Sequence, residues 1–168
     1  PSWNTNLLFY RRFIDDVFGI WLCDPHPDKN TTLWTSFKNT MQGWYGLEWE
    51  FSNLTNTCNF MDLSLSIVNQ KIHSTLYEKK QNLYLYIPPN SSHPTGMLSG
   101  LIHGNVTRIH RLCSSTKDIR IKTLAFYDRL TQRGYNKATL DALFKRAIIN
   151  AQKNANNTYT DHTHQTQQ

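Results

Sequence analysis

The sequence predicts an α+β fold, in which an antiparallel sheet with a packed helix precedes a small helical bundle. Short apolar stretches with a period of two residues recur between residues 7 and 87. Longer stretches with a period near 3.6 residues fill residues 91–153. Strands followed by a run of helices are typical of α+β proteins rather than of alternating α/β proteins.

The strand-rich part begins with a hairpin whose arms are residues 7–13 and 17–22, with Asp15 and Asp16 at its tip. An amphipathic helix follows at about residues 31–45, with Asn30 or Thr31 as its N-cap. The remaining elements are predicted as strand 47–52, a hairpin of 60–68 with 71–79, strand 82–87, and helices at about 92–112, 116–133 and 137–153.

Charge is distributed unevenly along the chain. Residues 1–70 hold four Lys/Arg against seven Asp/Glu, and residues 71–168 hold fourteen against five. This asymmetry favours metal binding in the first part and contact with a phosphate backbone in the second. The alternative is that the basic surface only keeps the protein soluble.

Composition argues against several classes of protein. We see no apolar run of membrane-spanning length and no leader sequence, so a soluble, intracellular protein is expected. Three widely spaced cysteines predict a reducing compartment rather than a disulfide framework. His103 and His110 share a helix face, but the sequence offers no third ligand at a spacing typical of zinc sites.

The adjacent carboxylates of Asp15 and Asp16 lie between apolar strands, where they repel each other and disfavour β structure. A divalent cation would explain the pair, because Mg²⁺ prefers oxygen ligands and phosphoryl transfer commonly uses two such ions. The alternative is that both residues simply form the turn.

The stretch Tyr10–Trp21 resembles the third palm motif of reverse transcriptases, and most closely that of Penelope-like retroelements, which are relatives of the telomerase enzymes. Shorter matches follow in the family's order: Phe60–Leu63, Leu76–Lys79, Tyr86-Ile87 with Ser92-His93-Pro94, Arg108–Cys113 and Arg133-Gly134-Tyr135.

The resemblance implies three regions: the C-terminal part of a polymerase palm at 1–90, a helical thumb at 91–153 and a disordered tail at 154–168. The fingers and an upstream palm strand with a further metal-binding Asp would precede residue 1. Because the chain starts at Pro1 and reaches the hairpin at once, we expect an excised fragment.

The resemblance also implies roles for single residues. Asp15 and Asp16 would bind two Mg²⁺ ions, or Mn²⁺ in their place, as the catalytic residues, and Phe13 would pack beneath the nucleotide or primer end. A primer-grip-like segment would comprise Leu83, Tyr84, Leu85 and Tyr86. Nucleic-acid contacts would come from Lys79, Arg108, Arg111, Arg120 and Lys122.

The expected function is therefore that of an RNA-directed DNA polymerase, which uses an RNA template, a DNA primer and dNTPs, in the nucleus. The isolated piece is expected to be inactive. Two alternatives stay open. One is a non-catalytic remnant that binds nucleic acid or acts as a scaffold, and the other is a two-metal nuclease or nucleotidyl transferase that depends on Asp15.

Overall fold

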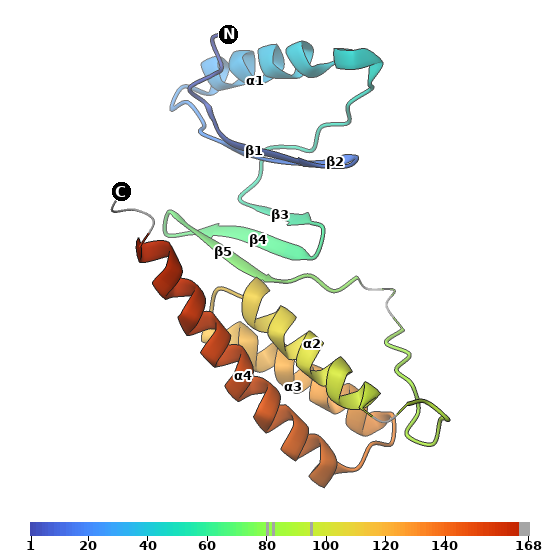
Figure 1. The fold of residues 1–168 in the computed structure, drawn as a ribbon. Coiled ribbons are helices and arrows are strands. Elements are labelled where there is room, and N and C mark those ends of the chain that lie inside the picture. The colour runs from blue at the N-terminus through green and yellow to red at the C-terminus, as the bar shows by residue number, and fades with distance from the viewer. Residues whose placement is uncertain (80, 82, 95, 165–168) are drawn as a thin grey trace. The chain divides into compact units, whose positions relative to one another are not determined.

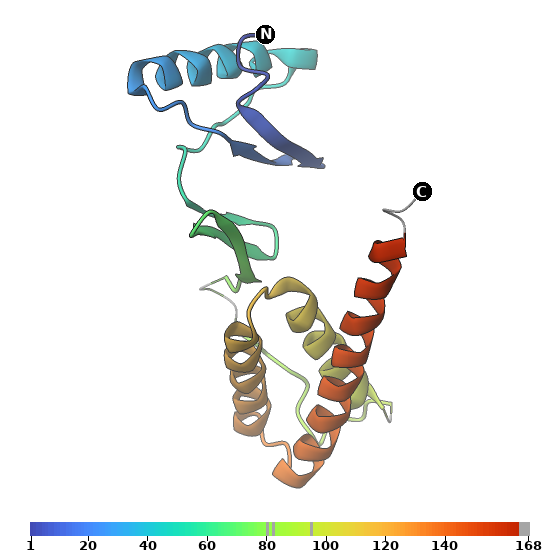
Figure 2. The same cartoon turned by 90° about the vertical axis from the view of Figure 1, so that its left-hand side faces the viewer.

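The computed structural model describes residues 1–79, 81, 83–94 and 96–164 (Figures 1 and 2). Two antiparallel sheets and four α-helices in this part of the chain confirm the α+β class. The chain divides into two compact units, residues 1–56 and residues 57–168. One sheet lies in the first unit and the other in the second. The predicted boundary at residue 90 therefore does not coincide with the division between the units at residue 56.

The first unit opens with the predicted hairpin. Strand β1 (Leu7–Phe13) pairs antiparallel with β2 (Asp16–Trp21), and Phe13 lies opposite Asp16. Ile14 and Asp15 form the two-residue turn between them. Ile14 has a φ of 50°, which is unusual for a β-branched side chain. The Asp pair is thus divided between the turn and the first position of β2.

Helix α1 (Pro27–Met41) begins four residues before the predicted start at Thr31. Proline suits the first helical turn, because its φ is already fixed and the missing N–H would have no helical partner there. Asn30, which the sequence suggested as an N-cap, lies inside the helix. Its side-chain oxygen accepts hydrogen bonds from Trp21 Nε1 at 3.1 Å and from the Asp24 amide at 3.2 Å.

The predicted strand at residues 47–52 is wrong: the short 3₁₀ helix η1 (Trp44–Gly46) is followed by extended chain without strand pairing. Aromatic packing holds this segment instead. The Phe51 ring lies 6.1 Å from the Trp34 ring and 6.2 Å from the Phe37 ring, measured between centroids. Phe37 is buried on α1, so the segment is fixed by its side chains rather than by a ladder.

In the second unit, strands β3 (Thr57–Phe60), β4 (Leu63–Val68) and β5 (Lys71–Leu76) form an antiparallel sheet in that order. The predicted long strand over 60–68 is split by a turn at Met61 and Asp62, with Met61 at a φ of 51°. The second turn, Asn69-Gln70, was predicted and is present. Both of its residues have positive φ, as the favoured two-residue hairpin turns require.

Three helices follow: α2 (Met97–Leu112), α3 (Thr116–Gln132) and α4 (Lys137–His164). They lie side by side in both ribbon views (Figures 1 and 2). Helix α2 starts later than the predicted Ser92, after Gly96 at a φ of 95°. The core of the bundle comprises Ile102, Val106, Phe126, Leu130, Leu140, Phe144, Ala147 and Ala151.

The β3–β5 sheet packs on these helices through the end of β5. Leu76 forms a buried cluster with Ile109 and Cys113 of the α2 region. The Ser114 amide donates a hydrogen bond to the Ser74 carbonyl at 2.9 Å. This contact is the physical reason that the strands before residue 90 belong with the helices after it.

Two further predictions are corrected. The described residues 83–87 contain no strand, so the predicted strand at 82–87 is wrong in that part, and Asn82 lies outside the described residues. The predicted disordered tail is helical over 154–164, and 165–168 lie outside the described residues. Extending a helix costs less than nucleating one, so polar residues can continue α4. No helix in the described part has both the length and the apolar character that crossing a bilayer requires.

Candidate nucleic-acid interface

The two aspartates at the hairpin tip are exposed, and Phe13 beside them retains 51% of its accessible surface. In the part of the chain that the structure describes, no group of three or more His, Cys, Asp or Glu side chains is arranged to hold a metal ion. The metal site predicted at Asp15 and Asp16 therefore stays a prediction.

The predicted primer-grip-like segment alternates between exposed and packed side chains. Leu83 and Leu85 retain 78% and 75% of their accessible surface. The Tyr84 ring lies against the Arg129 guanidinium, with Arg129 Cζ 3.6 Å from the ring centroid, and the Tyr86 ring packs on Phe126. The segment is therefore attached to α3 by its tyrosines, although it forms no strand.

Glu78 joins this segment to α3 through two cations. Its carboxylate accepts hydrogen bonds from Arg129 Nη1 at 2.6 Å and from Lys122 Nζ at 2.9 Å. Partial burial would raise the pKa of Glu78, but these two hydrogen bonds outweigh it and lower the pKa from 4.5 to about 2. Lys122 was predicted to contact nucleic acid, and here it is neutralised by a carboxylate of its own chain.

The other predicted nucleic-acid contacts are exposed. Arg108 forms an ion pair with Asp62, whose oxygen lies 2.5 Å from Arg108 Nη2. Lys79, Arg111 and Arg120 make no ion pair within the described residues. Three of the five predicted cations are thus free to meet phosphate groups, and a fourth is held only by an exposed partner.

A four-residue turn, Arg133–Asn136, joins α3 to α4 and fixes the geometry of this helix pair. The Tyr135 amide donates to the Leu130 carbonyl at 3.2 Å, and the Gly134 amide donates to the Thr131 carbonyl at 3.0 Å. These two bonds form a Schellman motif, with Gly134 at a φ of 99°. A helix-turn-helix unit commonly has such a short turn with a glycine.

Gly134→Ala is expected to lower the free energy of unfolding by about 1 to 2 kcal/mol, because an L side chain is strained at that φ. Gly100→Ala provides the matched control. It lies inside α2, where an added Cβ would meet no neighbouring atom within 4 Å, so the same change should raise stability by about 0.5 to 1 kcal/mol. Urea unfolding followed by circular dichroism measures both. Equal effects at the two glycines would contradict the assignment of Gly134 as a required turn residue.

Two side-chain contacts complete the helix pair. The side-chain oxygen of Asn136 accepts a hydrogen bond from the Thr139 amide at 3.3 Å at the start of α4. Tyr127 on α3 donates its hydroxyl to Asp141 Oδ1 on α4 at 2.8 Å. The first half of α4 is therefore held in a fixed orientation relative to α3.

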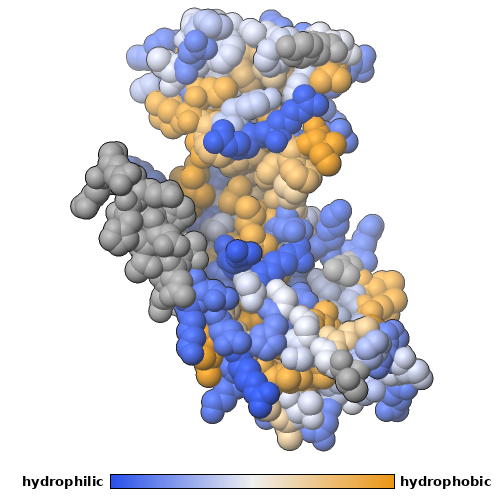
Figure 3. Space-filling view, viewed as in Figure 1, coloured by the Kyte–Doolittle hydropathy of each residue, from blue (hydrophilic) through white to orange (hydrophobic). Residues whose placement is uncertain are grey.

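Sequence reasoning missed several exposed cations on these helices. These cations lie in segments that were predicted as amphipathic helices from their apolar residues alone. The same period of about 3.6 residues places the cations on the helix faces opposite the core. Hydrophilic side chains follow α4 below the grey residues in the space-filling view (Figure 3). The missed residues that are exposed and form no ion pair in the described chain are Lys117, Lys137, Lys145, Arg146 and Lys153.

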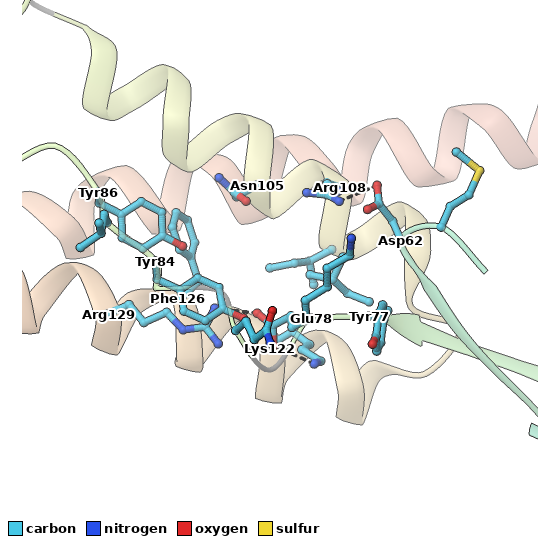
Figure 4. Close-up of a pocket in the computed structure, with 16 residues that line it drawn as sticks. Asp62, Tyr77, Glu78, Tyr84, Tyr86, Asn105, Arg108, Lys122, Phe126 and Arg129 are labelled. Atoms are coloured by element: carbon cyan, nitrogen blue, oxygen red, sulfur yellow. Dashed lines mark hydrogen bonds and ion pairs between the residues drawn. The ribbon is translucent and has the colours of Figure 1, made fainter. Parts of the chain in front are cut away.

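The unit also contains a hollow of about 580 Å³ between α2, α3 and the chain around residues 77–86 (Figure 4). The Glu78 cluster with Lys122 and Arg129 lies on one side of it, and the Asp62–Arg108 pair lies on another. Tyr84 and Tyr86 contribute aromatic surface to the same hollow. Its lining is thus mixed, with more cations than carboxylates.

Comparison with known proteins identifies one region of the chain. Residues 85–145 match the family model of an animal helix-turn-helix domain. The match covers the end of the extended segment, α2, α3 and the first part of α4. Neither a curated protein nor a solved structure matches the chain.

The resemblance to Penelope-like reverse transcriptases is therefore wrong: the family that matches is the helix-turn-helix domain, and no reverse transcriptase family matches. The motifs that suggested it are short, and Arg133-Gly134-Tyr135 is explained by the turn between α3 and α4. The predicted polymerase activity, its magnesium ions and its nuclear location are tested by none of these findings.

Proposed function

We propose that the helical part of the second unit, residues 85–145, binds double-stranded DNA. The match to a helix-turn-helix domain carries this proposal. The Schellman turn at Gly134 and the capped start of α4 support it, because they hold two helices rigidly around a short connection. The interpretation agrees with the nucleic-acid-binding alternative that the basic half of the sequence suggested.

In helix-turn-helix proteins the second helix of the pair enters the major groove, and its N-terminal residues contact base edges. Here that helix is α4. Its exposed N-terminal half presents cations and small side chains, which suit contact with phosphates and with base edges respectively. These exposed residues are Lys137, Ala138, Thr139, Ala142, Lys145 and Arg146.

A second group of cations lies where α2 ends and α3 begins. Arg111, Lys117 and Arg120 are all exposed. Ser115 caps the N-terminus of α3 by accepting a hydrogen bond from the Asp118 amide at 3.1 Å, so the first turn of this helix is well fixed. We assign these cations to backbone phosphates, which fix the register of the protein on the duplex without reading its sequence.

The test is fluorescence anisotropy with labelled duplex DNA over a range of salt concentrations. The double variant Lys145→Gln/Arg146→Gln should bind roughly 10- to 30-fold more weakly near physiological salt. The reason is that binding releases fewer counterions from the DNA when two phosphate contacts are missing. The slope of log K against log salt should become shallower by about 2 for the same reason.

Lys71→Gln is the matched control, because Lys71 is exposed in the same unit but lies on β5, outside the three helices. It should change the affinity less than twofold. Equal losses in the double variant and the control would show that α4 is not the contact surface, and absence of duplex binding by the wild-type chain would refute the proposal.

A further inference from the structure

Two hollows meet at the Asp62–Arg108 ion pair. The first is the hollow of about 580 Å³ described above, and the second, of about 570 Å³, lies along α2 beside His103, Gly104 and Thr107. Asp62 and Arg108 line both of them. Both volumes fall in the range of ordinary small-ligand sites. Figure 4 shows the Asp62 carboxylate facing the Arg108 guanidinium from the turn between β3 and β4.

The charges around the two hollows favour an anion. Glu78 already neutralises part of the charge of Lys122 and Arg129. Lys79 in the first hollow and Arg111 in the second have no carboxylate partner in the described chain. The carboxylates that line the two hollows are Glu78, which is paired with Lys122 and Arg129, and Asp62, which is not.

The Asp62–Arg108 pair is a weak one. The two side chains retain 59% and 46% of their accessible surface, so water and salt screen their attraction. Glu78, with 22% exposed, is held far more firmly. An incoming phosphate could therefore take Arg108 from Asp62, whereas it would not displace Glu78 from its two partners.

The backbone at Asp62 does not depend on this ion pair. The Tyr77 amide donates a hydrogen bond to the Asp62 carbonyl at 2.8 Å, and the next residue, Leu63, pairs with Leu76 across the sheet. These backbone bonds do not involve the carboxylate, so we expect the turn to keep its position when the carboxylate leaves the guanidinium. This argues against the simpler interpretation that the ion pair is needed to dock the sheet on α2.

We propose that the region around Arg108 is a binding site for a phosphate of a nucleic-acid backbone. When no nucleic acid is bound, Asp62 takes the place of the phosphate by forming an ion pair with Arg108. Lys79 and Arg111 would contact the same strand on either side. Asp62 thereby limits the affinity of the unit for nucleic acid. This inference rests on the proposed function. It adds a second contact surface, around Arg108 on α2, to the one proposed on α4.

The test compares Asp62→Asn with Asp128→Asn, which removes the same charge from an exposed position of α3 that lines neither hollow. Anisotropy is measured with labelled duplex DNA and, separately, with single-stranded DNA, since either could supply the phosphate. Asp62→Asn should bind at least one of them roughly threefold to tenfold more tightly, with a salt slope steeper by about 1. Asp128→Asn should change the affinity roughly twofold at most.

Circular dichroism should show both variants as fully folded as the wild type, because each replaced side chain is exposed. If Asp62→Asn gains no more affinity than Asp128→Asn with either nucleic acid, while the wild type binds duplex DNA, only this inference is overturned. If no variant binds either nucleic acid, both the inference and the proposed function fail.

Discussion

Leu140→Ala is expected to lower the free energy of unfolding of the second unit by about 2 to 5 kcal/mol. Leu140 has no accessible surface and belongs to the buried cluster that α2, α3 and α4 share. Removing its side chain loses the transfer free energy of the buried methyl groups and leaves a cavity. Because Leu140 lies between exposed Thr139 and Asp141 at the start of α4, the variant should also bind DNA more weakly.

Leu124→Ala is the matched control, since it makes the same change on α3 at a side chain that retains 52% of its surface. It should alter stability by about 0.5 kcal/mol or less. Urea unfolding followed by far-UV circular dichroism suits the measurement, because α2–α4 contain most of the helix. All five tryptophans lie in residues 1–56, so their fluorescence reports on the other unit. A small effect of Leu140→Ala would contradict a close-packed bundle.

Glu78→Gln is expected to destabilise the second unit by about 1 to 3 kcal/mol at neutral pH. The change leaves Lys122 and Arg129, which are only partly exposed, without their carboxylate. The cation–π contact of Arg129 with Tyr84 would also lose its fixed geometry. The extended segment before α2 should then detach from α3 more readily, which hydrogen exchange of the described residues 83–87 would detect.

The pH dependence follows from the same carboxylate. The pKa of Glu78 is lowered from 4.5 to about 2 in the folded chain, so its stabilisation is fully present above pH 4.5. It is lost as the pH falls from 4.5 through 2, when the folded state must take up the proton. After allowance for solvent screening, this loss amounts to about 1 to 2 kcal/mol.

Unfolding free energies measured between pH 5 and pH 2 test this directly. The wild type should lose more stability over that interval than Glu78→Gln, which has no carboxylate to titrate at this position. Asp128→Asn, exposed on α3, should follow the wild type. Parallel pH curves for the wild type and Glu78→Gln would show that the two hydrogen bonds to Glu78 contribute no net stability.

Local patterns in the sequence predicted much of the fold. The hairpin around Asp15, the turn between residues 68 and 71, and the end of the helix predicted over 116–133 are all present, because each depends on residues close in sequence. The same reasoning placed a strand at 82–87, where β propensity is high. The structure has no partner strand for the described part of it, and its tyrosines instead pack on α3, about 40 residues away.

The candidate site was harder to predict than the fold. Lys122 and Arg120 look alike in the sequence, yet Lys122 meets a carboxylate 44 residues earlier while Arg120 is exposed. Only the fold distinguishes a cation that is neutralised from one that is free. Asp62 is a similar case, because a turn in the middle of a predicted strand brings it to Arg108 on α2.

We propose that the helix pair around Gly134 binds duplex DNA through α4. Amide chemical-shift mapping of the full 168-residue chain on addition of duplex DNA tests it most directly. The largest changes should fall in residues 137–146 and around the α2–α3 connection at 111–120, and they should disappear at high salt. Changes confined to residues 1–56, or no changes at any DNA concentration, would contradict the claim.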